Sequence, residues 1–287
     1  PRHYAIVDKA LKSGMPKNEL KQLVNKIRLK LNPHPAGQME HNVPELNGTK
    51  LTGIQHKYDQ TVLFFPNHGQ TCHAYCTFCF RWPQFVGMDE LKFAMRETDL
   101  LIEYLREHPE VTDVLFTGGD PMIMNADRLR MYIEPLLEAD LSNLRTIRIG
   151  TKSLGFWPYR FINDKDSDAV LELFETVAKS GKHLALMGHF SHPQELKTPA
   201  VQEAIRRIRN TGAQIRTQSP VMRNINDDPA IWAEMWKEQV NQGCIPYYMF
   251  IARDTGARDY FSVPLEQCWQ IFQQAYQQVS GICRTVR

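Results

Sequence analysis

Short apolar runs alternate with longer amphipathic stretches over most of the chain, from about residue 61 to the end. Short apolar runs predict buried strands, and apolar residues spaced three or four apart predict helices. The pattern predicts six strands, at Thr61–Pro66, Asp113–Thr117, Thr146–Thr151, His183–Phe190, Gln214–Ser219 and Pro246–Ile251. A helix is predicted after each strand, at Glu97–His108, Ala126–Glu138, Ser167–Ser180, Thr198–Thr211, Asp228–Gln242 and Leu265–Ser280.

Six strand–helix units in succession predict a parallel sheet covered by helices, because neighbouring parallel strands need a long crossover between them. The periodicity does not distinguish an open doubly wound sheet from a partly closed barrel. Residues 1–60 are polar, with one predicted helix at Pro16–Leu31 and a loop rich in helix breakers at Asn32–Gly37. We therefore predict an N-terminal helical and loop extension (1–60) followed by one α/β domain (61–287).

Residues capable of chemistry lie at or after the end of each predicted strand. They are the segments Cys72–Cys79, Gly118–Pro121, Gly150–Lys152, His189–His192, Gln218–Ser219 and Arg253–Asp254. In parallel α/β folds the ligand site forms at the carboxyl ends of the strands, since the following loops meet there. The sequence therefore predicts that these segments share one pocket.

The charge balance excludes some classes of partner. The chain has 34 basic and 32 acidic residues, a net charge of +2, spread along the sequence, so we expect no nucleic-acid or lipid partner. No stretch approaches the roughly 18 apolar residues that cross a membrane, and Pro1–Tyr4 contains no apolar signal core. We expect a cytoplasmic protein with a small-molecule substrate. The lack of an initial Met suggests part of a longer polypeptide.

Three of the six cysteines, Cys72, Cys76 and Cys79, lie within eight residues with the spacing C-x₃-C-x₂-C. This density is typical of metal ligation in a reducing compartment. Three thiolates on one loop can hold a cubane iron–sulfur cluster and leave its fourth iron open. The alternative is a structural zinc site, which needs a fourth ligand such as His68 or His73. We predict buried free thiols for Cys244, Cys268 and Cys283.

The three cysteines, with Phe78 just before the last, resemble the signature of the radical S-adenosylmethionine (SAM) superfamily. The resemblance implies that they bind a [4Fe-4S] cluster whose open iron is chelated by SAM. Reductive cleavage of SAM would then give a 5′-deoxyadenosyl radical that abstracts hydrogen from the substrate. Gly118-Gly119-Asp120-Pro121 resembles the superfamily's GGE motif, with Asp in place of Glu, although an ordinary turn is the alternative. We expect this turn and the strand-end residue Thr151 to contact SAM.

From about residue 51 to 262 the chain resembles the lysine 2,3-aminomutase family. The matching segments are Gln55-His56-Lys57-Tyr58, Cys79-Phe80-Arg81, Phe85-Val86-Gly87, Thr117-Gly118-Gly119-Asp120, Ile147-Arg148-Ile149-Gly150, His189-Phe190-Ser191-His192-Pro193, Gln218-Ser219, Asn226-Asp227 and Pro246-Tyr247-Tyr248. The resemblance implies a partial (βα)₆ barrel. It implies that Arg81 binds the substrate α-carboxylate, a task that suits a planar guanidinium, although a solvated surface arginine is the alternative. It also implies that His189 and Gln218 contact SAM and that Tyr58 lines a pyridoxal phosphate (PLP) pocket.

The chain departs from the family at several positions. Family members bind PLP through a lysine after the barrel, whereas the last lysine here is Lys237, inside the fifth predicted helix. The PLP-lysine segment is absent, either because a C-terminal part is missing or because PLP is not held covalently. The family's arginine three residues after the matched tyrosine is Thr61, and the cysteine of its structural zinc site is Asp228.

A further departure is Arg253. Counted without gaps, it stands where the lysine enzymes have an aspartate for the substrate ammonium. A cation at this position would repel a lysine side chain and pair with a carboxylate. We predict an acidic or neutral amino acid as substrate, and the alternative is an ion pair of Arg253 with Asp254 or Asp259.

The sequence as a whole predicts an enzyme, a radical SAM isomerase of the amino-acid 2,3-aminomutase type. One alternative is a PLP-independent radical SAM enzyme that epimerises or oxidises its substrate. Another is a catalytically silent iron–sulfur or zinc binding module. Flavodoxin or ferredoxin is the reductant that this chemistry implies, and the oligomeric state, a homo-oligomer included, is left open.

Overall fold

A curled sheet of seven strands forms the centre of the protein, with the strand order β3-β4-β5-β6-β7-β8-β9. The computed structural model describes residues 2–32, 37, 39–79, 81–85, 91–251 and 257–287. The strands are β3 (Ile54–Tyr58), β4 (Thr61–Phe64), β5 (Asp113–Phe116), β6 (Thr146–Thr151), β7 (His183–His189), β8 (Gln214–Val221) and β9 (Ile245–Ile251). From β4 to β9 each strand pairs in parallel with the next in sequence. In the described residues β3 and β9 do not pair with each other, so the barrel is incomplete, as the family resemblance implies.

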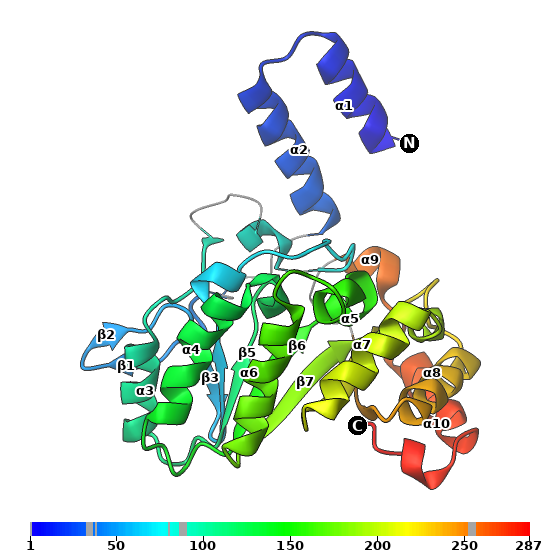
Figure 1. Ribbon diagram of the computed structural model, residues 1–287. Coiled ribbons are helices and arrows are strands. Elements are labelled where there is room, and N and C mark those ends of the chain that lie inside the picture. Colours follow the sequence, from blue (N-terminus) through cyan, green and yellow to red (C-terminus); the bar gives the residue numbers. More distant parts are fainter. Residues whose placement is uncertain (1, 33–36, 38, 80, 86–90, 252–256) are drawn as a thin grey trace.

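Helices cover the outer, convex face of this sheet (Figure 1). They are α3 (Thr98–Glu107), α4 (Ala126–Glu138), α6 (Ser167–Lys179), α7 (Pro199–Asn210), α8 (Pro229–Asn241) and α10 (Leu265–Gln277). Their first turns carry the expected signals, since Thr198 and Asp228 cap α7 and α8 and a proline follows each cap. All six predicted strand–helix units are therefore confirmed, to within a few residues at their ends.

The two faces of the sheet differ in polarity because side chains alternate along a strand. In β6 the side chains of Ile147 and Ile149 are buried in the core, whereas Thr146 and Arg148 are half-buried and line a cavity on the concave face. β8 alternates in the same way. The concave face is thus lined by polar groups that can bind a ligand.

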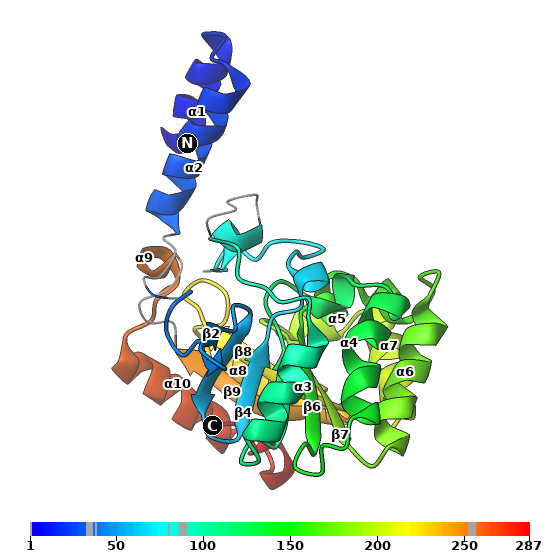
Figure 2. The ribbon, with the colours of Figure 1, turned by 90° about the vertical axis from the view of Figure 1, so that its left-hand side faces the viewer.

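The segment before β4 contains more structure than the sequence predicted. The predicted helix is confirmed as α2 (Lys17–Leu31), and α1 (Arg2–Lys12) precedes it in a helical hairpin that projects from the barrel (Figures 1 and 2). A small hairpin, β1 (Glu45–Leu46) and β2 (Thr49–Lys50), follows, and then β3 pairs antiparallel with β4. We missed β3 because it is an edge strand in which only Ile54 is fully buried, so its apolar pattern is weak.

The hairpin is anchored at its base to the loop that carries the cysteines. Asn32, which ends α2, donates from Nδ2 to the carbonyl oxygen of Cys79 at 2.9 Å. Trp82 donates from Nε1 to the carbonyl oxygen of Asn32 at 2.8 Å. The N-terminal extension therefore helps to hold the cysteine loop.

Shorter elements occupy the loops at the carboxyl ends of the strands and elsewhere. They are η1 (Asn67–Gly69), η2 (Trp82–Phe85), η4 (Pro121–Ile123), α5 (Ser153–Phe156), η5 (Pro158–Phe161), η6 (Pro193–Leu196), α9 (Arg258–Phe261) and η7 (Gly281–Cys283). None of the helices in the described residues is both long and apolar enough to span a bilayer. Cys244, Cys268 and Cys283 are buried free thiols, as predicted.

Candidate active site

One cavity of about 280 Å³ lies at the carboxyl ends of the parallel strands, where the sequence predicted a shared pocket. Its walls come from the cysteine loop and from the ends of β5, β6, β7 and β8. The predicted site residues that line it are Cys72, Cys76, Cys79, Arg81, Gly118, Gly119, Asp120, Thr151, His189 and Gln218. Gln218 lies within β8, which continues to Val221, two residues further than predicted.

The cysteine loop lies directly against the turn that follows β5. The backbone N–H of Asp120 donates to the carbonyl oxygen of Thr71 at 2.7 Å, immediately before Cys72. A Cβ atom on Gly119 would lie 2.3 Å from that same oxygen, and Gly118 has a φ of +122°, which only glycine adopts readily. The two glycines therefore allow the backbones of the turn and the cysteine loop to touch.

The carboxylate of Asp120 is buried, 5% exposed, and it accepts four hydrogen bonds. Oδ1 accepts from the Met122 N–H at 3.0 Å and the Thr151 hydroxyl at 2.7 Å. Oδ2 accepts from the Lys152 N–H at 2.9 Å and the Ser153 hydroxyl at 3.0 Å. Asp120 thus joins the end of β5 to the end of β6. Because both of its carboxylate oxygens are already hydrogen-bonded, a ligand would contact the backbone of the turn and not this side chain.

Burial raises the pKa of all three cysteine thiols. The pKa of Cys72 is raised by burial and then by the nearby carboxylate of Asp120. That of Cys76 is raised to about 12 by burial, against the opposing charge of Lys152. Burial also raises the pKa of Cys79, although the backbone N–H of Arg81 opposes it. Thiols in this environment need a bound cation to become thiolates, so the donor set fits a positively charged metal centre.

Among the described residues, no group of three or more His, Cys, Asp or Glu side chains is arranged to hold one metal ion. A cubane cluster does not require such a group, because each thiolate binds a different iron.

Lys152 is a lining residue whose role the sequence did not reveal. Its ammonium donates to Glu195 Oε2 at 2.9 Å and to the carbonyl oxygen of His189 at 3.3 Å, and the pair is largely buried. Glu195 in turn accepts from the backbone N–H groups of Ser191 and His192. A lysine directly after a strand end was the only sequence signal. The pair fixes the Lys152 ammonium beside the cysteine loop, where it lowers the pKa of Cys76 while Glu195 raises it.

His189 stands at the end of β7 against the cysteine loop. Its ring lies 5.5 Å from that of Phe78, and its Nε2 is 3.3 Å from the Ser191 hydroxyl. Burial, and then the charge of Lys152, lowers the pKa of His189 well below its usual value. The imidazole is therefore neutral at pH 7, and it can accept or donate one hydrogen bond in the cavity.

Arg81 lies two residues after the last cysteine and lines the cavity, where its side chain contacts the core and β3. Its guanidinium lies 4.7 Å from the centre of the Phe65 ring, and Nη2 donates to Gln55 Oε1 at 3.5 Å. Burial lowers its pKa to about 10, so it remains charged at pH 7. A buried, charged, planar donor lining a cavity is suited to binding a carboxylate.

Two predicted site residues lie elsewhere. Tyr58 is 64% exposed and lines a second cavity, near the amino ends of the strands, together with Thr61. Arg253 and its neighbour Asp254 lie outside the described residues.

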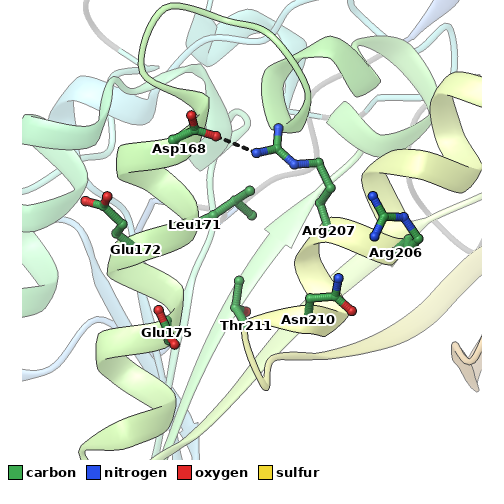
Figure 3. A pocket seen from close by; sticks show the side chains of 8 residues that line it. All are labelled: Asp168, Leu171, Glu172, Glu175, Arg206, Arg207, Asn210 and Thr211. Atoms are coloured by element: carbon green, nitrogen blue, oxygen red, sulfur yellow. Dashed lines mark hydrogen bonds and ion pairs between the residues drawn. The ribbon is translucent and has the colours of Figure 1, made fainter.

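A surface pocket of about 350 Å³ also lies between α6 and α7 (Figure 3). Asp168 on α6 and Arg207 on α7 form an ion pair across it, and Arg207 also donates to the carbonyl oxygens of Phe161 and Ile162. Arg207 therefore joins α7 to the segment before α6. These groups are used in packing the outer helices, on the face of the sheet opposite the polar cavities.

The barrel is similar to solved structures of radical SAM enzymes. A radical SAM methyltransferase from Sphaerobacter thermophilus matches 99% of this chain and 93% of its own, with a TM-score of 0.52 and 15% identity. At this identity the likeness concerns the fold alone. No protein-family model matches the chain.

The sequence is similar to proteins named as lysine 2,3-aminomutases. An Aquifex aeolicus protein named "Putative L-lysine 2,3-aminomutase" is 36% identical over 239 residues, which are 83% of this chain and 61% of the relative. The L-lysine 2,3-aminomutase of Clostridium subterminale is 25% identical over 248 residues, 86% of this chain and 56% of that protein. The chain thus spans only part of the length of these relatives.

The half-barrel sheet, with the C-x₃-C-x₂-C loop beside a Gly-Gly turn, has the fold of the solved radical SAM enzymes. In sequence the chain is similar to the lysine 2,3-aminomutases, as the resemblance implied.

Proposed function

We propose that this chain is the catalytic barrel of a radical SAM amino-acid 2,3-aminomutase, an isomerase that moves an amino group from the α to the β carbon. One observation carries the proposal: three cysteines and the residues matched to SAM and carboxylate binding line a single cavity at the carboxyl ends of the strands. Because the chain covers only part of its relatives, the activity of the whole protein is part of the proposal.

The residues of this chain would divide the work as follows. Cys72, Cys76 and Cys79 would hold a [4Fe-4S] cluster, which together with SAM supplies an electron and a hydrogen-abstracting radical. The Gly118–Gly119 turn lies against the cysteine loop and lines the cavity, and its backbone would bind SAM. His189 and Gln218, on the neighbouring strands β7 and β8, would hydrogen-bond SAM from the opposite wall.

The substrate would be bound through its α-carboxylate by Arg81, which lines the cavity and contacts Phe65 and Gln55. We further propose a substrate other than lysine, because Arg253 introduces a cation where the lysine enzymes have a carboxylate. A flavodoxin or ferredoxin in the cytoplasm would supply the electron.

PLP would bind in the second cavity, which has a volume of about 880 Å³ and is lined by Tyr58 and three arginines. No lysine is among its described lining residues, so the residues present can hold the phosphate of PLP but offer no amine for an imine. PLP binding at this place is part of the proposal.

The test is anaerobic reconstitution with iron and sulfide, followed by measurement of 5′-deoxyadenosine released from SAM with a panel of amino acids. We expect turnover that requires Cys76, so that Cys76→Ala releases none, while Cys244→Ala, which changes a buried thiol remote from the cavity, releases as much as wild type. Undiminished release from the Cys76→Ala variant would refute the proposal. Strong turnover of lysine that Arg253→Ala leaves unchanged would refute the charge argument for the substrate.

A further inference from the structure

Three charged side chains line the candidate active-site cavity, and they are Arg81, Asp120 and Lys152. In the proposed function Arg81 binds the substrate carboxylate, and Asp120 holds the ends of β5 and β6 together. Lys152 follows β6 directly, its side chain is only 11% exposed, and it shares the cavity with the three cysteines. The proposed function leaves this buried ammonium without a task.

The Lys152 ammonium is held in one place by several partners. Nζ donates to Glu195 Oε2 at 2.9 Å and to the carbonyl oxygen of His189 at 3.3 Å. It also donates to Ser191 Oγ at 3.5 Å and lies 4.8 Å from the centre of the Phe156 ring. Because all of these partners belong to the protein, the fold and not a ligand fixes the position of the charge.

Glu195 is fixed as firmly as its partner. Its Oε1 accepts from the backbone N–H of Ser191 at 2.8 Å and from that of His192 at 3.1 Å. A Cβ atom on Gly155 would lie 2.5 Å from Oε2, so the glycine leaves the space that the carboxylate occupies. Glu195 is not among the described residues that line the cavity, whereas Lys152 is. The ion pair is therefore a fixed dipole whose positive end lines the cavity.

A fixed charge at the wall of a partly buried cavity acts on any charged centre inside it. The field of Lys152 reaches the cavity, since it adds to burial in lowering the pKa of His189. One-electron reduction makes an iron–sulfur cluster more negative, and net charge is one of the factors that set its potential. A cation at the wall therefore stabilises the reduced cluster, and an uncompensated carboxylate stabilises the oxidised one.

We propose that the Lys152–Glu195 ion pair sets the reduction potential of the cluster held by the three cysteines, with Lys152 raising the potential and Glu195 limiting the rise. The inference rests on the proposed function for the presence of the cluster. Both side chains are positioning residues, which neither bind iron nor carry the electron; that electron comes from the reductant. A higher potential makes the cluster easier to reduce and weakens its power to reduce SAM, so the pair adjusts the two steps against each other.

The experiment is a potentiometric titration of the whole chain after anaerobic reconstitution, without SAM, in which electron paramagnetic resonance measures the reduced cluster. Lys152→Met leaves the carboxylate uncompensated. We expect it to shift the one-electron equilibrium about 10-fold toward the oxidised cluster, which is about 59 mV to lower potential. Glu195→Gln leaves the ammonium uncompensated and should raise the potential, by a smaller factor because Glu195 does not line the cavity.

Three further variants separate charge from structure. Lys152→Arg keeps the charge and should stay near the wild-type potential. The double variant Lys152→Met/Glu195→Gln removes both charges and should fall between the two single variants. The matched control is Lys197→Gln, which breaks the exposed Lys197–Glu234 pair and should leave the potential unchanged, because water and salt screen exposed charges. Glu195→Gln is nearly isosteric, so its shift is measurable even where Lys152→Met does not retain the cluster.

Shifts of the same sign in Lys152→Met and Glu195→Gln would overturn the inference, because loosening of the site moves both variants alike whereas charge moves them apart. Wild-type potentials in both variants, or a potential in Lys152→Arg as low as in Lys152→Met, would also overturn it. A wild-type chain that takes up no cluster refutes the proposed function and the inference together. Opposite shifts without release of 5′-deoxyadenosine refute the proposed function alone, and release with equal potentials refutes the inference alone.

Discussion

Removal of the Asp120 carboxylate is the sharpest test of how the active-site end of the barrel is held together. In Asp120→Ala the backbone N–H groups of Met122 and Lys152 lose their acceptor, whereas the hydroxyls of Thr151 and Ser153 can rotate toward others. A buried donor left without a partner costs about 1–3 kcal/mol, and more when its partner was charged. Two such donors predict a loss of about 3–6 kcal/mol in the free energy of unfolding.

The substitution Asp120→Asn refines this prediction. Each carboxylate oxygen accepts from one backbone N–H, so either orientation of the amide places its NH₂ against a backbone donor. We expect a loss of about 1–3 kcal/mol, smaller than for Ala. The control is Asp228→Ala, which removes one helix cap, that of Ala230 N–H at 2.8 Å, and should cost about 1 kcal/mol.

The assay is equilibrium unfolding in urea under reducing conditions without iron, so that cluster binding does not contribute. The slope of the free energy against urea should stay constant across the variants, which shows that the same surface is exposed. If Asp120→Ala costs no more than Asp228→Ala, the carboxylate does not join β5 to β6 and the argument is wrong.

Three further predictions concern the same cavity. Gly119→Ala should prevent iron incorporation while the protein stays folded, because the new Cβ would lie 2.3 Å from the Thr71 carbonyl oxygen. The control is Gly281→Ala, where nothing lies within 4 Å of the new Cβ. Equal iron content in the two variants would contradict the prediction. Lys152→Met should lower the free energy of unfolding in urea by about 3 kcal/mol, because Glu195 stays partly buried without its cation. The double variant Lys152→Met/Glu195→Gln should recover part of this loss. If the losses of the two single variants simply add, the two residues are not a coupled pair. The pKa of His189 is lowered in the folded protein, so below about pH 6.5 the unfolded chain binds a proton that the folded chain does not, and the free energy of unfolding should fall. In urea unfolding between pH 7 and pH 5, His189→Gln should show a smaller fall than wild type. An identical fall in both proteins would contradict this.

Local patterns were enough to predict the succession of strands and helices. β5, for example, was expected at Asp113–Thr117 and forms at Asp113–Phe116, because a short apolar run between polar turns has few other ways to bury itself. The carboxyl-end rule then predicted that Cys72, Gly119, His189 and Gln218 meet, and they line one cavity. β3 escaped prediction, since an edge strand buries too little of its surface to show a periodic pattern.

The sequence by itself determined which residues could do chemistry and at which end of the sheet most of them lie, because strand direction and side-chain alternation are properties of the local chain. Only the tertiary structure decided which of these groups already form hydrogen bonds or ion pairs within the protein. Asp120 accepts four hydrogen bonds, three of them from residues more than 30 positions away, and Arg148 is paired with Asp113 while Arg216 is not. Whether a charge remains available for a ligand depends on partners that the fold brings from distant parts of the chain, and spacing along the sequence does not reveal them.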